Sequence, residues 1–354
     1  MRIALDVQST LGRPTGIGQY TKQLLAALRR VAPGHEFVEL NWGRDVIMRT
    51  DRRLRWQQWE LPRRARAVGA DLLHVTGFDA PRLRPCPVVL TVHDLVGMLF
   101  PHNLPPVARL YWSRWLPYSV RWATRLIADS QHTRADLIRL LGVAPERIEV
   151  VYLGVDDSLR PVTDLERLAA VRQRYGIADR LILYLGTLEP RKGLDTLIAA
   201  FAQVAADLPH HLVIAGKEGW YTGPLFRQVR TLGLERRVHF TGYVAAEDQA
   251  ALYSLADLFV FPSRYEGFGL PVLEAMACGT PVVCSKAASL PEVAGDAAVL
   301  IPPEDAGALA AAVLKVLQDG TLRQGLRERG LERARRFTWE ETARRTLAIY
   351  EQVT

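Results

Sequence analysis

Short apolar runs recur along the whole chain, and turn-forming residues bound each of them. Such runs are typical of buried β-strands. Segments with apolar residues at helical spacing lie between the runs, as in 193–208 and 304–320. Strands that alternate with helices predict an α/β protein whose parallel sheets carry helices on both faces. The expected strands are 2–7, 36–42, 71–76, 87–94, 125–130 and 148–155 in the first half, and 181–187, 211–217, 237–243, 257–263, 281–285 and 297–303 in the second.

Six expected strands in each half predict two Rossmann-like domains. The polar stretch near 157–178 separates the halves, so we place the first domain at 1–165 and the second at 166–337. Ligands of such folds bind beyond the carboxyl ends of the strands. Residues that carry chemistry should therefore follow directly after strands.

Composition adds that the protein is of ordinary globular type, with 354 residues, 49% hydrophobic residues and a mean hydropathy near zero. The first residues continue as a strand rather than as a signal peptide. Three cysteines, Cys86, Cys278 and Cys284, lack the spacing of a metal site. They suggest reduced thiols and a cytoplasmic location.

Charge is distributed unevenly, because residues 1–160 hold 23 Lys and Arg against 15 Asp and Glu. The excess gathers in 44–66 and 109–125, where arginines alternate with tryptophans. One interpretation is that the aromatic residues are core faces of amphipathic helices with a solvated arginine rim. The other is contact with an anionic membrane surface, which would make the protein peripheral on the inner face of the cell membrane. No nucleic-acid motif is present, so we expect no nucleic-acid partner.

The segment 259–283 combines a strand, a glycine-rich turn and a helix. Residues 259–261 read as a buried strand, and a helix runs from Pro271 until Gly279 closes it. The first N–H groups of a helix have no partner inside the helix and commonly bind phosphate. Two glutamates, Glu266 and Glu274, nevertheless flank this turn.

A pair of cations follows another strand, at Arg191 and Lys192, just before a helix that opens at Gly193. Positive side chains beside a helix N-terminus suit a diphosphate, although adjacent basic residues are often only a solvated pair. A diphosphate would lie between these cations and the amides at 268–270. A carboxylate accepts hydrogen bonds from a vicinal diol, so Glu274 could grip a ribose and Glu266 a sugar on the other side. Phosphate between two hydroxyl-rich groups describes a nucleotide-sugar.

Two further candidates follow strands of the first half. Gly16 and Gly18 would let the backbone approach a ligand, but the third glycine of a dinucleotide fingerprint is missing, and a plain turn explains them equally well. His93 ends a strand beside Asp94. It is either a structural histidine or a hydrogen-bonding residue of a ligand site.

With these elements in place, the sequence resembles the retaining GT-B glycosyltransferases of glycosyltransferase family 4 (group 1), in particular bacterial mannosyltransferase-type enzymes of surface polysaccharide synthesis. The resemblance covers essentially the whole chain. Its most specific part is Glu266-x7-Glu274 within "EGFGLPVLEAMACGTPVV". The other matching segments are "TGIGQYTKQLL", "WQQWELPRRARAVGADLLHV", "LTVHDL", "IADSQHTRADLIRLLGVAPERIEVVYLGVD", "YLGTLEPRKGLDTLIAAFA", "LVIAGKEGW" and "VHFTGYV".

The resemblance implies a GT-B fold, in which two Rossmann-like domains face each other across a donor-binding cleft, and it implies a role for each candidate. The implied catalytic residues are His93, Glu266, Arg191 and Lys192, and the implied donor-binding residues are Gly16, Gly18, Thr187, Gly216, Tyr243, Val244, Phe268, Gly269, Leu270 and Glu274. Glu274 would bind the ribose, Glu266 and His93 the transferred sugar, and Tyr243 with Val244 the base. Many members carry an arginine where this chain has Thr187, so Arg191 would take a larger share of the phosphate.

The implied reaction is transfer of a hexose, first of all mannose from GDP-mannose, to a glycan or a lipid-linked saccharide. Configuration would be retained by front-face attack. No Asp-x-Asp motif follows a strand, and cations with a helix dipole can stabilise the leaving diphosphate, so no metal cofactor is expected. Two alternatives are a nucleotide-sugar epimerase of the same fold and a basic membrane-binding protein without catalysis.

The last helix is expected to begin after Thr338, which forms a capping-box pattern with Glu341. Its apolar face has no obvious partner in the second domain. One expectation is that this helix packs on the second domain, which precedes it in the sequence. The resemblance implies instead that residues 338–354 cross back and complete the first domain.

Overall fold

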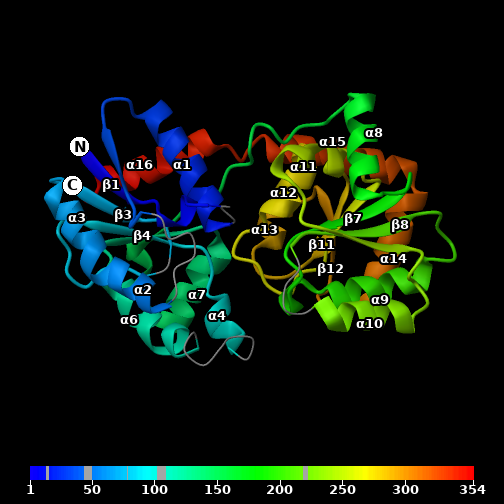
Figure 1. Ribbon diagram of the computed structural model, residues 1–354, viewed down its shortest axis with the longest axis horizontal. Coiled ribbons are helices and arrows are strands. Elements are labelled where there is room, and N and C mark those ends of the chain that lie inside the picture. Colours follow the sequence, from blue (N-terminus) through cyan, green and yellow to red (C-terminus); the bar gives the residue numbers. More distant parts are fainter. Residues whose placement is uncertain (13–15, 44–49, 78, 102–108, 218–221) are drawn as a thin grey trace. The chain divides into compact units, whose positions relative to one another are not determined.

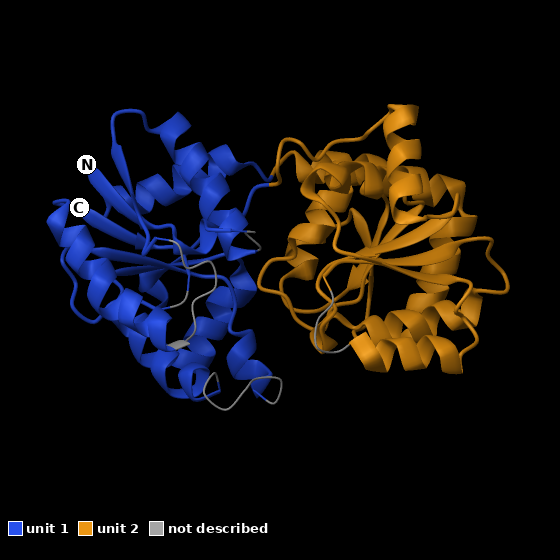
Figure 2. Cartoon of the chain, in the orientation of Figure 1, with its two compact units in different colours: residues 1–154, 337–354 blue, residues 155–336 orange. Residues whose placement is uncertain are grey.

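The computed structural model describes residues 1–12, 16–43, 50–77, 79–101, 109–217 and 222–354. The chain divides into two compact units, which Figure 2 colours separately: unit 1 holds residues 1–154 and 337–354, and unit 2 holds 155–336. The first break thus lies at 154/155 rather than at the predicted 165/166. Residues beyond 154 are attached to unit 2, where the N–H of Val162 donates to Ser254 Oγ at 3.0 Å.

Unit 1 contains a six-stranded parallel sheet in the order β2-β1-β3-β4-β5-β6. Its strands are β1 (Arg2–Asp6), β2 (Glu36–Leu40), β3 (Leu72–Val75), β4 (Val88–Val92), β5 (Arg125–Ala128) and β6 (Ile148–Val150). Its helical elements are η1 (Gln8–Thr10), α1 (Ile17–Val31), α2 (Thr50–Arg55), η2 (Trp56–Glu60), α3 (Leu61–Ala67), α4 (Val96–Leu99), η4 (Tyr111–Trp115), α6 (Leu116–Ser119), η5 (Val120–Trp122), α7 (Gln131–Leu141), η6 (Pro145–Arg147) and α16 (Trp339–Glu351). The strands match the expected ones.

Side chains of this sheet alternate between two helical layers, as the period of a strand requires. Leu73 and Val75 of β3 join a buried cluster with Trp56, Leu61 and Leu116 on one face. His74, between them, points to the other face and binds Tyr350. Figure 1 shows α1 and α16 on one side of the sheet and α2, α3 and α6 on the other.

The C-terminal helix α16 packs against α1 and so belongs to unit 1, although unit 2 precedes it in the sequence. Thr338 caps it by accepting a hydrogen bond from the N–H of Glu341, while the carboxylate of Glu341 pairs with arginines of its own helix. At the far end the hydroxyl of Tyr350 lies 2.6 Å from His74 Nδ1. The expectation that this helix crosses back to the first unit is confirmed. Gly154 is required at the crossing, since a Cβ there would lie 2.3 Å from the backbone N of Trp339.

Unit 2 contains a second six-stranded parallel sheet, in the order β12-β11-β10-β7-β8-β9. The strands are β7 (Leu181–Leu185), β8 (His211–Ala215), β9 (Val238–Gly242), β10 (Leu258–Phe261), β11 (Val282–Ser285) and β12 (Ala298–Ile301). The helical elements are α8 (Leu165–Tyr175), η7 (Pro190–Lys192), α9 (Leu194–Val204), α10 (Thr222–Thr231), α11 (Ala246–Leu255), α12 (Leu270–Ala277), α13 (Leu290–Ala294), α14 (Ala306–Gln318) and α15 (Gly320–Ala334).

Helices cover both faces of this second sheet, as predicted. Figure 1 shows α9, α10 and α14 on one face and α11, α12 and α15 on the other, and α9 packs directly on α14 and α12 on α15. None of the helices that the structure describes is long and apolar enough to cross a bilayer.

Candidate active site

The order of the strands decides where unit 2 can bind a ligand. β7 and β10 are neighbours, yet the chain leaves them in opposite directions, toward β8 and toward β11. In folds of this kind the loops after two such strands diverge, and ligands usually bind between them at the carboxyl edge of the sheet. The loop after β7 carries Arg191 and Lys192, and the loop after β10 carries Glu266.

Three predicted site residues meet at this point. Lys192 Nζ lies 2.7 Å from Glu266 Oε1, and Arg191 Nη1 lies 3.1 Å from the same oxygen. The hydroxyl of Ser263 donates to it at 2.6 Å. The side chains of Lys192 and Glu266 are 9% and 10% exposed, so their charges are largely removed from water.

Ionisation of this cluster follows from competition between burial and charge. Burial raises the pKa of Glu266, but the charges of Lys192 and Arg191 and their hydrogen bonds outweigh it and bring the pKa to about 2. Burial lowers the pKa of Lys192, and the carboxylate opposes that shift. Arg191 also pairs with Glu189, at 3.1 Å. The two predicted cations are thus paired with two carboxylates, Glu266 and Glu189.

The glycine turn leads into α12 as predicted. Gly269 is the N-cap with φ 108°, a conformation that favours glycine, and a Cβ there would lie 2.5 Å from Leu290 Cδ2. The hydroxyl of Ser289 donates to the carbonyls of Glu266 and Phe268 at 2.9 and 2.7 Å and so fixes the turn. In the part of the chain that the structure describes, the N–H groups of Gly269 and Leu270 donate to no protein acceptor. The turn thus presents backbone donors at the positive end of a helix.

Glu274 lies one helical turn further along α12. Its Oε2 accepts a hydrogen bond from the hydroxyl of Tyr253 at 2.8 Å. Burial raises its pKa, and the Tyr253 bond opposes that shift. The residue as a whole is half-buried, and the bond from Tyr253 orients its carboxylate.

The remaining candidates in unit 2 follow β7, β8 and β9. Gly216 (φ 140°) is needed because a Cβ would lie 2.0 Å from the carbonyl oxygen of Gly186, so the close approach that the structure shows is between two strand ends. Thr187 is half-buried, and its carbonyl accepts from the hydroxyl of Tyr184 at 3.2 Å. After β9, Tyr243 is 58% exposed, while the next residue, Val244, is buried.

Unit 1 holds the other three candidates. Gly16 (φ 36°) is the N-cap of α1, and Gly18 is buried in its first turn. His93 follows β4, with Nδ1 at 2.6 Å from Asp129 Oδ2 and Nε2 at 2.8 Å from the carbonyl oxygen of Thr76.

Both acceptors of His93 are matched by a ring N–H, so this arrangement favours the protonated form of the ring. Burial lowers its pKa, but the charge and hydrogen bond of Asp129 outweigh burial, and the net effect is a raised pKa. Asp129 therefore stabilises the protonated form of His93 at the carboxyl edge of the first sheet.

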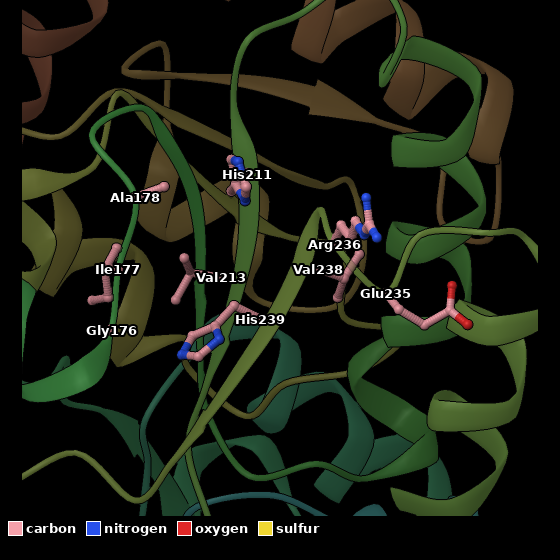
Figure 3. Close-up of a pocket in the computed structure, with 9 residues that line it drawn as sticks. All are labelled: Gly176, Ile177, Ala178, His211, Val213, Glu235, Arg236, Val238 and His239. Atoms are coloured by element: carbon pink, nitrogen blue, oxygen red, sulfur yellow. The ribbon is translucent and has the colours of Figure 1, made fainter.

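A cavity of about 340 Å³ in unit 2 lies away from these residues (Figure 3). His211 begins β8 and Val238 with His239 begins β9, so the cavity lies at the amino ends of the strands. It contains none of the candidate residues. Across the described residues, no group of three or more His, Cys, Asp and Glu is arranged to hold a metal ion.

Sequence reasoning missed the residues that position the candidates. Ser263 and Ser289 hold Glu266 and its turn, Tyr253 orients Glu274, and Asp129 holds His93. Asp129 follows directly after β5, and Ser263 comes two residues after the end of β10, a signal that could have found them. Tyr253 lies inside α11, and nothing in its local sequence distinguishes it.

Comparison with known proteins gives a consistent result for both halves. Residues 170–333 match the family model described as "Glycosyl transferases group 1", and residues 14–159 match "Glycosyltransferase Family 4". An O-antigen chain mannosyltransferase B of Escherichia coli is 37% identical over 74% of this chain and 70% of its own length. The serotype-specific mannosyltransferase WbdA of the same species is 32% identical over 73% of this chain, which spans only 32% of WbdA.

Among solved structures, a sucrose-phosphate synthase from Thermosynechococcus elongatus is similar over 99% of this chain and 98% of its own, with a TM-score of 0.78. Its sequence identity is 24%, so the similarity concerns the fold.

Proposed function

Because the chain belongs to the group 1 glycosyltransferases of glycosyltransferase family 4 and has the GT-B fold, we propose that it is a retaining hexosyltransferase. The proposed donor is a nucleotide-diphosphate sugar, GDP-mannose first, and the acceptor is a glycan or lipid-linked saccharide in cell-surface polysaccharide synthesis. The observation that carries the proposal is the cluster of Arg191, Lys192 and Glu266 beside the N-terminus of α12. The mannosyltransferase relatives support the choice of sugar.

Unit 2 would bind the donor through this cluster. The diphosphate would take over the cations from Glu266 and Glu189 and accept hydrogen bonds from the N–H groups of Gly269 and Leu270. One carboxylate oxygen of Glu274 accepts a hydrogen bond from Tyr253, and the carboxylate would also accept hydrogen bonds from the ribose hydroxyls. Glu266 would then have lost part of its ion pairing and could accept hydrogen bonds from the hydroxyl groups of the transferred sugar. Tyr243 and Val244 are proposed to line the base.

Catalysis would rest on positioning and electrostatics. As the bond from the anomeric carbon to the phosphate oxygen breaks, the acceptor oxygen bonds to the same face, and its proton passes to the leaving diphosphate. The charge that develops on the diphosphate would be stabilised by Arg191, Lys192 and the dipole of α12, so the reaction would need no divalent metal. Glu266 is assigned no nucleophilic role; its carboxylate, whose Oε1 also accepts from the hydroxyl of Ser263, is proposed to act as a hydrogen-bond acceptor for the sugar.

Unit 1 is proposed to serve the acceptor side. Gly16 and Gly18 would pass close to the phosphate and sugar, and His93 would meet the transferred sugar. We also propose a cytoplasmic location, which agrees with three free cysteines.

A thermal-shift panel of nucleoside diphosphates and nucleotide-sugars tests the donor. A ligand that binds only the folded protein raises the unfolding temperature by mass action, and GDP and GDP-mannose should give the largest shifts. A clear preference for UDP would refute the proposed base. Incubation with donor alone tests the activity class: a transferase leaves the sugar unchanged apart from slow hydrolysis, whereas release of an epimer would show the alternative enzyme.

A further inference from the structure

Two helical segments of unit 1 expose aromatic residues within lines of arginines. The first is the continuous helix α2-η2-α3, where Trp59 is 68% exposed. The exposed residues Arg52, Arg55, Trp59, Arg63 and Arg66 follow one another at spacings of three or four. Such spacing places them on one face of a helix.

The second segment runs through η4, α6 and η5. Leu110 and Tyr118 are 63% and 60% exposed, and with Arg114 and Arg121 they again follow at spacings of four, four and three. The buried residues of the same segment, such as Tyr111 and Leu116, face the core. The interpretation that these stretches are amphipathic helices with a core face is thus correct for Tyr111 and Leu116. It does not explain Trp59 and Tyr118, which have no partner in the described chain.

We call these two rows of exposed side chains stripes. Their helical segments are neighbours in unit 1, because both bind a single buried carboxylate. Asp79 accepts hydrogen bonds from Trp115 Nε1 at 2.9 Å and Tyr111 at 2.7 Å in the second segment. It accepts another from Gln58, next to Trp59, at 2.9 Å. The Oε1 of Gln58 in turn accepts from the N–H of Arg82, the neighbour of exposed Leu83.

We propose that this surface, composed of the two stripes with Leu83, binds an anionic lipid bilayer. Tryptophan and tyrosine concentrate at the headgroup level of membranes because one end of the side chain is apolar and the other polar. Arginines beside them would meet lipid phosphates. Arg52 and Arg55 also line a surface hollow of about 600 Å³ with Trp42 and Asp51, which offers room for a headgroup.

Charge favours a lipid over a neutral glycan as the occupant. The exposed cations of the two stripes and of the residues next to them include Arg52, Arg55, Arg63, Arg66, Arg82, Arg84, Arg109, Arg114 and Arg121. Among the described residues of the same parts of the chain (50–67, 79–84 and 109–122), the acidic ones are Asp51, Glu60 and the buried Asp79. A neutral sugar ring would use the aromatic faces but would not need this excess of cations. The proposal is independent of the proposed enzymatic activity.

The test is cosedimentation of the full chain with vesicles of equal parts phosphatidylglycerol and phosphatidylcholine, compared with phosphatidylcholine alone. We expect binding to the anionic vesicles only, and loss of binding as salt is raised. Arg63→Gln and Arg114→Gln should each weaken partitioning about fivefold, the equivalent of about 1 kcal/mol per cation. Trp59→Ser should weaken it further, with an unchanged unfolding temperature because the side chain is exposed.

Matched controls lie in unit 2, where Leu165→Ser removes an exposed apolar side chain and Arg230→Gln an exposed cation. Neither should alter partitioning. Equal binding to neutral vesicles, no binding to anionic ones, or unchanged partitioning of the stripe variants would each overturn the proposal. So would stripe variants that lose affinity for a soluble glycan while they keep affinity for lipid.

Discussion

Lys192→Met removes one charge from the buried cluster and keeps most of the side-chain volume. Glu266 then loses its partner at 2.7 Å and keeps Arg191 at 3.1 Å and Ser263 at 2.6 Å. Breaking a buried ion pair from one side costs about 3–5 kcal/mol when the remaining charge is uncompensated. Because Arg191 remains beside Glu266, we expect a smaller effect: the free energy of unfolding of unit 2 should fall by about 2–3 kcal/mol at neutral pH.

The pH dependence of this loss has a definite sign. The pKa of Glu266 is about 2 in the folded protein against an ordinary value of 4.5, so the ionised carboxylate stabilises the fold above about 4.5. This stabilisation disappears as the pH falls from 4.5 toward 2. Removal of Lys192 raises the pKa of Glu266, and protonation then relieves the unpaired charge. The difference in the free energy of unfolding between wild type and variant should therefore become smaller as the pH falls from 7 toward 4.

Urea unfolding followed by hydrogen exchange measures the loss of stability in unit 2 itself. Two units can unfold separately, so the amides of β7 and β10 should be followed rather than a global signal. The double variant Lys192→Met/Glu266→Gln removes both charges and should regain most of the lost stability. Lys315→Met removes an exposed lysine of α14 and serves as the matched control.

Two results would refute this reasoning. One is a loss no greater than that of Lys315→Met, which we expect to stay within about 0.5 kcal/mol. The other is a double variant as unstable as the single one, because that would show no coupling between Lys192 and Glu266.

Three other predictions concern the ribose contact, the last helix and the metal. Glu274→Ala should weaken binding of the nucleoside diphosphate by about 1–3 kcal/mol in calorimetry, and an equal loss for a 2′,3′-dideoxy analogue would contradict a contact with the ribose. Truncation after Arg336 removes α16, in which Trp339 and Tyr350 are 6% and 0% exposed, and should uncover their partners Tyr20 of α1 and His74 of β3. It should therefore lower hydrogen-exchange protection of β1 and β3; unchanged protection would show that α16 adds nothing to unit 1. EDTA should leave the transfer rate unchanged, and a strict requirement for an added divalent ion would refute the metal-independent mechanism.

The strands and the sheet type could be predicted from the sequence, because both depend on local patterns. A buried parallel strand needs a continuous apolar run, as in β7 and β10, and such a run is visible without the fold. The turn at Gly269 and the helix from Leu270 were visible for the same reason, since glycine and proline act on their own backbone. The residue types of the candidate site were identified in this way.

Only the tertiary structure decided which of these residues meet. Glu266 and Lys192 are 74 positions apart, and their contact exists because β7 and β10 are neighbours in the sheet. Strand order depends on long-range packing, which no local pattern records. Arg191 shows the same consequence, because its Nη1 lies 3.1 Å from the same oxygen of Glu266, a residue that its own stretch of sequence does not indicate as a partner.

The limits of unit 1 were decided in the same way. Local signals predicted α16 and its cap at Thr338, but nothing local says which sheet the helix covers. Its position follows from Tyr350 on His74 and from the backbone contact of Trp339 with Gly154, partners that are distant in the sequence. The sequence by itself therefore determined the elements and the chemical groups, because both are written in short stretches of chain. Packing between distant segments decided which groups share a site, because burial and ion pairing depend on neighbours that only the folded chain supplies.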